Sequence, residues 1–202
     1  GLGSVYWHMV SKLLLAVQET IMRCSDASVR GKLLIKYREI RSGLGFIKTP
    51  AAFGAFPTDP YSHTPKGQGA RQPGMSGVVK EEIITRLVDL GLTIKNGCLV
   101  FNPIFIDQSE FINNSSQFTY IDVDGIKQQL DLEPNSLAYT YCQTPIVLQP
   151  AEKSEIRVSY TNGKSGTISG MSLDETNSSH IHHRDGKIQK LLVRYIPADL
   201  LM

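Results

Sequence analysis

This chain of 202 residues has little cysteine, a single tryptophan and no long apolar run. Its three cysteines, Cys24, Cys98 and Cys142, are far apart and form no CxxC pair, which excludes a disulfide framework and a thiolate metal site. We expect buried thiols. Unpaired cysteines slightly favour a reducing, cytoplasmic location, but the sequence leaves the compartment unknown. The longest apolar run, Leu13–Val17, is far shorter than the ~20 residues that cross a bilayer, so we expect no membrane partner.

The chain also lacks an excess of charge of one sign. It has 21 basic and 19 acidic residues, a formal net charge of +2, and no basic run longer than an isolated pair. This balance argues against a nucleic-acid partner. An apolar content of 41% is enough for a buried core, and the length suits one large domain or two small ones.

Helical periodicity dominates the first half of the chain. Apolar residues at Met9, Leu13 and neighbouring positions recur at i, i+3, i+4 and i+7, which predicts a helix over Val5–Met22 with Gln18 on its polar face. A second helix follows a cap at Ser25 or Asp26, and a third is expected over residues 76–90. The first helix is so apolar that it needs packing partners on more than one side. We therefore expect the chain to be part of a longer protein.

The second half is predicted to be built from hairpins. Four dipeptides of Asn or Asp followed by Gly are typical of two-residue type I′ turns: Asn96-Gly97, Asp124-Gly125, Asn162-Gly163 and Asp185-Gly186. The last of these is expected to join strands Ile181–Arg184 and Ile188–Tyr195, after a surface loop over Ser169–Ser179. We predict an α+β fold, with a helical segment over residues 1–91 and an antiparallel β-sandwich domain over residues 92–202.

The segment Ala51–Gly77 is the strongest candidate for a binding loop. It holds five glycines and four prolines, and ordered loops longer than ~12 to 15 residues are usually functional. Planar polar groups beside aromatic rings suit a sugar, which has hydroxyls at its edge and an apolar face. The candidate sugar contacts are Asp59, Tyr61, His63, Arg71, Gln72 and Ser76. The alternative is an ordered cover over the helix ends.

Three further features could contribute to a site. Ser76 opens the third helix, whose free N–H groups could bind phosphate, although a plain N-cap is the alternative. Trp7 and His8 begin the first helix and are further candidates for sugar contact. Glu81 and Glu82 are candidate general bases, or solvated partners of the helix dipole.

The run His180, His182 and His183 is a possible zinc site only if a third ligand comes from elsewhere. In a strand, His180 and His182 would share a face, and a solvated edge strand is the alternative. We expect no metal and no cofactor.

The run Gly74–Pro103, GMSGVVKEEIITRLVDLGLTIKNGCLVFNP, resembles the end of the catalytic barrel in cellobiose and chitobiose phosphorylases, inverting enzymes of the glycoside hydrolase type. In that family a Gly-Ser turn opens the last barrel helix, a Leu-Gly follows, and a hairpin ending in Asn-Pro or Asp-Pro leads into a β domain. The resemblance implies that residues 1–91 are the end of an (α/α)6 barrel. Phosphate binds near a Thr-Gly-Ser turn in the family, and only Ser76 carries over from that turn.

The sequence thus predicts the carboxy-terminal part of a carbohydrate-active enzyme, contributing to a sugar-binding cleft. Its partners would be an oligosaccharide, with phosphate or water as the attacking group, and the upstream part of the same parent chain. The resemblance places the general acid upstream, so the fragment alone is expected to be inactive. The alternative is a noncatalytic β-sandwich module that binds a glycan or a protein.

Overall fold

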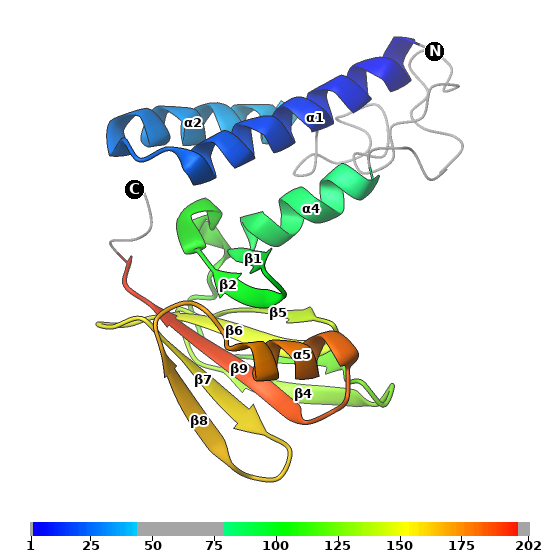
Figure 1. The fold of residues 1–202 in the computed structure, drawn as a ribbon, viewed down its shortest axis with the longest axis vertical. Helices are drawn as coiled ribbons and strands as arrows, with labels where there is room; N and C mark the ends of the chain where they lie inside the picture. The colour runs from blue at the N-terminus through cyan, green and yellow to red at the C-terminus, as the bar shows by residue number, and fades with distance from the viewer. Residues whose placement is uncertain (1, 44–78, 198–202) are drawn as a thin grey trace. The chain divides into compact units, whose positions relative to one another are not determined.

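The computed structural model describes residues 2–43 and 79–197, with the side chains of residues 2–8 and 79–80 outside the description (Figure 1). The predicted binding loop, Ala51–Gly77, lies outside the described residues. The chain divides into two units, Gly1–Leu87 and Val88–Met202, which we describe separately. Helices and antiparallel hairpins are both present, so the predicted α+β class is confirmed. Among the described residues, no helix is both long and apolar enough to cross a lipid bilayer.

The first unit contains the helices α1 (Leu2–Arg23) and α2 (Ala27–Gly43), and α4 (Val79–Asp89) begins in it. The predicted cap is confirmed, because Asp26 Oδ1 accepts a hydrogen bond of 3.0 Å from the Val29 amide. The buried apolar residues of α1 and α2 are Leu14, Ile21, Leu34 and Tyr37.

The predicted orientation of α1 is partly wrong. Gln18 is only 2% exposed, whereas Met9 is 66% and Leu13 is 52% exposed. The inward face is therefore centred on Leu14, Gln18 and Ile21, at i, i+4 and i+7. A buried amide is tolerated when it is hydrogen-bonded, and Gln18 Nε2 donates to the Tyr37 hydroxyl at 2.9 Å and to the Thr85 carbonyl at 3.1 Å.

A tight turn at Gly91 follows the end of α4 in the second unit. The Gly91 backbone has φ +74° and follows α4, and its carbonyl accepts a hydrogen bond of 2.7 Å from the Asn102 amide. Between these two residues lies the predicted hairpin of β1 (Leu92–Lys95) and β2 (Cys98–Phe101). Asn102 then caps the short helix η1 (Pro103–Phe105), which is followed by η2 (Gln108–Glu110).

The remaining strands form one two-stranded and one five-stranded sheet. The first is the predicted hairpin of β3 (Ser116–Ile121) and β4 (Lys127–Leu132). The second has the order β5-β6-β9-β7-β8 and comprises β5 (Leu137–Tyr141), β6 (Thr144–Pro150), β7 (Glu155–Tyr160), β8 (Ser165–Ser169) and β9 (Ile188–Tyr195). The last strand, β9, is central, since it pairs parallel with β6 and antiparallel with β7.

Three of the four predicted Asn/Asp-Gly turns join hairpin strands, at Gly97, Gly125 and Gly163, and one of these three has the predicted pair of positive φ angles. Asn96 and Gly97 both have positive φ, as a type I′ turn requires. In the turns at Gly125 and Gly163, only the glycine has positive φ. A second turn with both φ positive, at Cys142 and Gln143, joins β5 to β6 without any Asn-Gly signal.

The predicted strand over Ile181–Arg184 is wrong, because these residues end the helix α5 (Glu175–His183) or follow it. The predicted loop Ser169–Ser179 is correspondingly wrong in its second part. Asp174 caps this helix, since its Oδ1 accepts a 2.8 Å hydrogen bond from the Asn177 amide. Arg184, with φ 52°, ends it in the left-handed conformation. Asp185-Gly186 therefore connects a helix to β9 rather than two strands.

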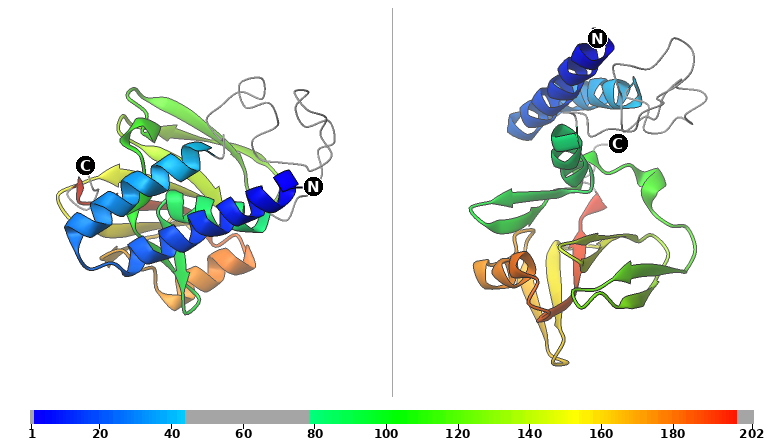
Figure 2. Two further views of the ribbon diagram at one scale, coloured as in Figure 1. Left: turned by 90° about the horizontal axis from the view of Figure 1, so that it is seen from above. Right: turned by 90° about the vertical axis from the view of Figure 1, so that its right-hand side faces the viewer.

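On β7 and β9 the two faces of the five-stranded sheet differ, one being apolar and the other mostly polar. Register places Ile156, Val158, Leu191 and Val193 on one face, and all four are fully buried. Within this unit, α5 lies on one side of the sheet and the β3–β4 hairpin lies on the other (Figure 2). The core of the unit is therefore centred on β9.

Candidate functional site

Most of the predicted sugar contacts cannot be placed. Asp59, Tyr61, His63, Arg71, Gln72 and Ser76 all lie outside the described residues. Trp7 and His8 belong to α1, as far as the backbone is described. The prediction that these residues line one pocket remains a prediction.

Glu81 and Glu82 lie in the first turn of α4. Arg41 engages both carboxylate oxygens of Glu82, at 2.8 and 3.0 Å, and both side chains are largely buried. This bidentate geometry gives Glu82 a structural role between α2 and α4. Glu81 Oε2 is buried and has no hydrogen-bond partner among the described residues. The role of either carboxylate as a general base stays a prediction.

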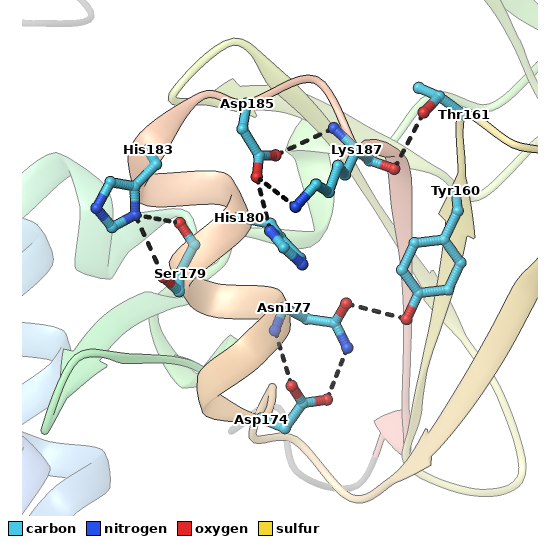
Figure 3. A network of polar contacts seen from close by, with 9 residues as sticks. All are labelled: Tyr160, Thr161, Asp174, Asn177, Ser179, His180, His183, Asp185 and Lys187. Atoms are coloured by element: carbon cyan, nitrogen blue, oxygen red, sulfur yellow. Dashed lines mark hydrogen bonds and ion pairs between the residues drawn. The ribbon is translucent and has the colours of Figure 1, made fainter.

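The three histidines of α5 each have a separate partner. Figure 3 shows His180 and His183 projecting in different directions from the helix. His180 Nδ1 lies 2.7 Å from Asp185 Oδ2, and His182 Nε2 lies 3.0 Å from the Gly97 carbonyl. His183 Nδ1 lies 2.8 Å from the Ser179 carbonyl. Within residues 2–43 and 79–197, no group of three His, Cys, Asp or Glu side chains is arranged to hold a metal ion.

Ser179 and His183 resemble a nucleophile and its base but cannot act as one. The Ser179 hydroxyl is 3.2 Å from His183 Nδ1, which also contacts the Ser179 carbonyl. A carbonyl oxygen only accepts, so Nδ1 carries the proton and cannot take one from the hydroxyl. The pair therefore stabilises the end of α5 rather than activating a serine.

The other polar contacts of α5 hold it to the sheet. Asn177 accepts from the Tyr160 hydroxyl at 3.0 Å and donates to Asp174 Oδ2 at 2.7 Å (Figure 3). Burial acts to raise the pKa of Asp185, but hydrogen bonds from the Lys187 amide and His180 outweigh it and lower that pKa. The cluster is a charged, satisfied network with structural roles.

A cavity lies elsewhere in the second unit, beside the β3–β4 hairpin. Its volume is about 200 Å³. The lining combines one aromatic ring, two carboxylates and three amide side chains with small and apolar groups: Tyr120, Asp122, Val123, Asp124, Gln128, Gln143, Pro145, Thr161, Gly186, Ile188 and Gln189. The groups come from four separate segments between Tyr120 and Gln189, so only the tertiary structure creates the cavity.

Asp122 organises the polar side of this cavity. Its Oδ1 accepts from the amides of Asp124 and Ile126, at 3.0 and 2.8 Å, and its Oδ2 accepts from Gln128 Nε2 at 2.8 Å. Its backbone carbonyl accepts from Gln143 Nε2 at 2.7 Å. The hydrogen bond from Gln128, followed by that from the Ile126 amide, lowers the pKa of Asp122 against the opposing effect of burial. Asp122 is therefore ionised and fixes the orientation of two glutamine side chains.

Tyr120 supplies the aromatic part of the lining. Its ring stacks on Phe118, with centroids 5.8 Å apart and an interplanar angle of 14°. Burial, and then the charge of Asp122, raises the pKa of the Tyr120 phenol, which therefore stays protonated and able to donate. Because Asp122 is a poor proton donor with a lowered pKa, the cavity is better suited to binding than to acid catalysis.

The cavity was not predicted from the sequence, because Asp124-Gly125 was interpreted only as a turn. The signal that could have found it is Asp122, two residues before Asp124, with Tyr120 and Gln128 on the flanking strands. The predicted burial of the cysteines is also only partly correct. All three are free thiols, as expected, but they are half-buried.

Comparison with known proteins does not assign the chain. Neither a protein-family model nor a curated protein matches the sequence. The resemblance of residues 74–103 to the phosphorylases therefore stays a prediction.

Proposed function

We propose that this protein is a carbohydrate-binding protein and that the cavity beside the β3–β4 hairpin takes a single sugar ring. The observation that carries the proposal is the fixed arrangement around Asp122, where Gln128 and Gln143 are both held by hydrogen bonds at the cavity wall. Glutamine amides and an ionised carboxylate provide donors and acceptors for hydroxyl groups. The Tyr120 ring provides an apolar surface for the face of the sugar.

The volume and the charge of the cavity limit the class of ligand that it can bind. Small-molecule pockets usually measure ~300–1,000 Å³, so about 200 Å³ is room for one ring rather than an oligosaccharide. The charged lining groups are Asp122 and Asp124, and no described lining residue is a cation. An anionic sugar would meet two carboxylates without compensation, so we propose an uncharged sugar rather than an anionic one.

The test is a titration of the full chain with neutral mono- and disaccharides, followed by NMR at the backbone amides of the cavity. We expect saturable shifts at Tyr120, Gln128 and Gln143. Gln128→Leu should weaken binding by about tenfold, because a lost hydrogen bond to a ligand typically costs ~0.5–1.5 kcal/mol and the Asp122 carboxylate also loses a partner.

Gln117→Leu is the matched control. Gln117 lies on the same hairpin and also donates to an aspartate, Asp131, at 3.0 Å, but it is exposed and does not line the cavity. Equal loss of affinity in both variants would place the ligand elsewhere. No saturable shift with any neutral sugar would reject the proposal.

A second proposal is that the chain is the carboxy-terminal part of an inverting glycoside hydrolase or phosphorylase. Support comes from the order of elements in the run that resembles the family, since α4 ends before Gly91, the β1–β2 hairpin follows, and Asn102-Pro103 leads into further β structure. The proposal includes an (α/α)6 barrel to which α1, α2 and α4 contribute. It also includes a β-sandwich. The supporting observation is that the β3–β4 hairpin lies over the face of the five-stranded sheet opposite α5 (Figure 2).

This second proposal is tested by activity rather than by binding. The full-length parent should cleave an oligosaccharide, with phosphate or water as the attacking group, while this chain alone should not. A parent that is inactive across a broad panel of glycans, with and without phosphate, would reject it while leaving the cavity proposal untouched.

A further inference from the structure

Over β7, β8 and β9, the face of the sheet opposite Ile156 and Val158 carries a group of cations that do not line the cavity. The strand register aligns three rows of cross-strand neighbours on this face, each with one residue from β8, β7 and β9. We call it the basic face, and its members are Ser169, Glu155 and Arg194, then Thr167, Arg157 and Leu192, then Ser165, Ser159 and Lys190. Three cations and one carboxylate give it a net charge of +2, equal to that of the whole chain.

The carboxylate of the basic face lies beneath the cations. The Glu155 side chain is only 4% exposed, whereas that of Arg157 is 46% and that of Arg194 is 34% exposed. Solvent therefore meets guanidinium and hydroxyl groups on this surface and almost none of the negative charge. A solvated sheet face is ordinarily polar with mixed charge, so this separation is the unusual feature.

Glu155 also fixes the cations in place. Its Oε1 lies 2.7 Å from Arg157 Nε and 3.6 Å from Arg194 Nη1, and its Oε2 lies 3.0 Å from Lys153 Nζ. One carboxylate needs one cation, and here it engages three. The two guanidinium groups are thus held together by a shared oxygen, which reduces the entropy lost when they bind an anion.

The cations are spread along the sheet rather than gathered at one point. Lys190 and Arg194 are four residues apart on β9, which corresponds to about 13 Å at the rise of a strand. Arg157 lies between them, beside Leu192 on the neighbouring strand. Such a row fits an extended polymer with repeated negative groups better than a single small anion.

We propose that the basic face binds an acidic polysaccharide, a chain of sugars bearing carboxylate or sulfate groups. The hydroxyl groups of Ser159, Ser165, Thr167 and Ser169 flank the cations and offer hydrogen bonds to sugar hydroxyls. Single-stranded nucleic acids are bound with aromatic side chains that stack on bases, and the basic face has none. No member of the basic face lines the cavity, so the two sites share no residue.

The experiment measures binding of the full chain to heparin and to polygalacturonate at low salt, with poly(dT) as the competing polyanion. We expect binding to the polysaccharides that weakens as salt rises, because exposed charges are screened. Lys190→Gln should weaken it about threefold to fivefold, and Thr167→Glu, which adds a negative charge beside Arg157, about tenfold. Neither variant removes a partner of the buried Glu155, so both should fold.

Lys32→Gln on α2 and Thr119→Glu on β3 are the matched controls, since both positions are exposed and lie off the basic face. The same losses in the controls, no loss in Lys190→Gln and Thr167→Glu, or no binding of either polysaccharide would each overturn the proposal. Binding of poly(dT) as strong as that of the polysaccharides would overturn the assigned class. Neutral-sugar binding in the cavity should be unchanged in Thr167→Glu, which separates the two sites.

Discussion

Alanine at Gly91 should destabilise the second unit far more than alanine at Gly97, although both glycines have nearly the same backbone conformation. Their φ angles are +74° and +78°. An alanine in the left-handed region costs ~1–2 kcal/mol at either position. A Cβ at Gly97 meets no atom within 4 Å, whereas a Cβ at Gly91 lies 3.1 Å from the Asn102 carbonyl oxygen, 3.1 Å from Ile106 Cδ1 and 3.3 Å from Pro103 Cα.

Two of the three neighbours of Gly91 are backbone atoms, which cannot turn away as a side chain can. Overpacking of this kind adds ~1–3 kcal/mol. We therefore expect a loss of about 2–5 kcal/mol in the free energy of unfolding for Gly91→Ala and about 1–2 kcal/mol for Gly97→Ala. The difference between the two variants isolates the close approach of the chain at Asn102.

The assay is urea unfolding of the full chain followed by NMR signals of the β1–β2 and β7–β9 strands, so that the second unit is observed separately from the helices. The slope of unfolding free energy against urea should be the same in both variants, which would show that the unfolded states are comparable. Losses that agree within ~0.5 kcal/mol would refute the reasoning, because the backbone strain that the two sites share would then account for both losses.

Four further predictions concern polar groups of the second unit. Tyr160→Phe should lower stability by about 1 kcal/mol in urea unfolding, because it removes the hydrogen bond to Asn177. Tyr139→Phe should be neutral or stabilising, because the Tyr139 hydroxyl is buried without a partner among the described residues; a comparable loss in both would contradict this. Asp174→Ala should cost about 1 kcal/mol and increase hydrogen exchange in the first turn of α5. Because the folded pKa of Asp122 lies below its ordinary value of 3.8, its contribution to stability is present above that pH and is lost as pH falls through the lower folded pKa. Asp122→Asn should therefore flatten the acid limb of a pH–stability profile, and an unchanged limb would count against the Asp122 network.

Only the local features of the candidate site could be predicted from the sequence. The Asp124-Gly125 turn and its strands were predictable because turn chemistry is local. The contact of Asp122 with Gln143 was not, because it joins residues 21 apart across two sheets. Glu81 and Glu82 were correctly placed in a first helical turn, but the partner of Glu82 is Arg41, which no local pattern links to it.

The region of α5 was predicted as the end of a loop followed by a strand, although the sequence contains a signal for the start of a helix. Asp174 followed by Glu175 is a helix N-terminus, and Arg184 follows its last turn. Ser, Asn and His within the helix have modest helix propensity, which hid the signal. Packing decided the outcome, since Ile181 is 1% exposed and the Tyr160–Asn177 hydrogen bond holds the helix to the sheet.

The amino-acid sequence by itself determined the α+β class, the periods of the helices and strands, and the hairpins whose turns carry an Asn or Asp before Gly. These features depend on neighbours within a few residues. Only the tertiary structure decided that β9 lies between β6 and β7, that Gln18 is buried while Met9 is exposed, and that one sheet face gathers its cations. These three features result from strand pairing and burial between distant segments, and such contacts produce no periodic pattern in the amino-acid sequence.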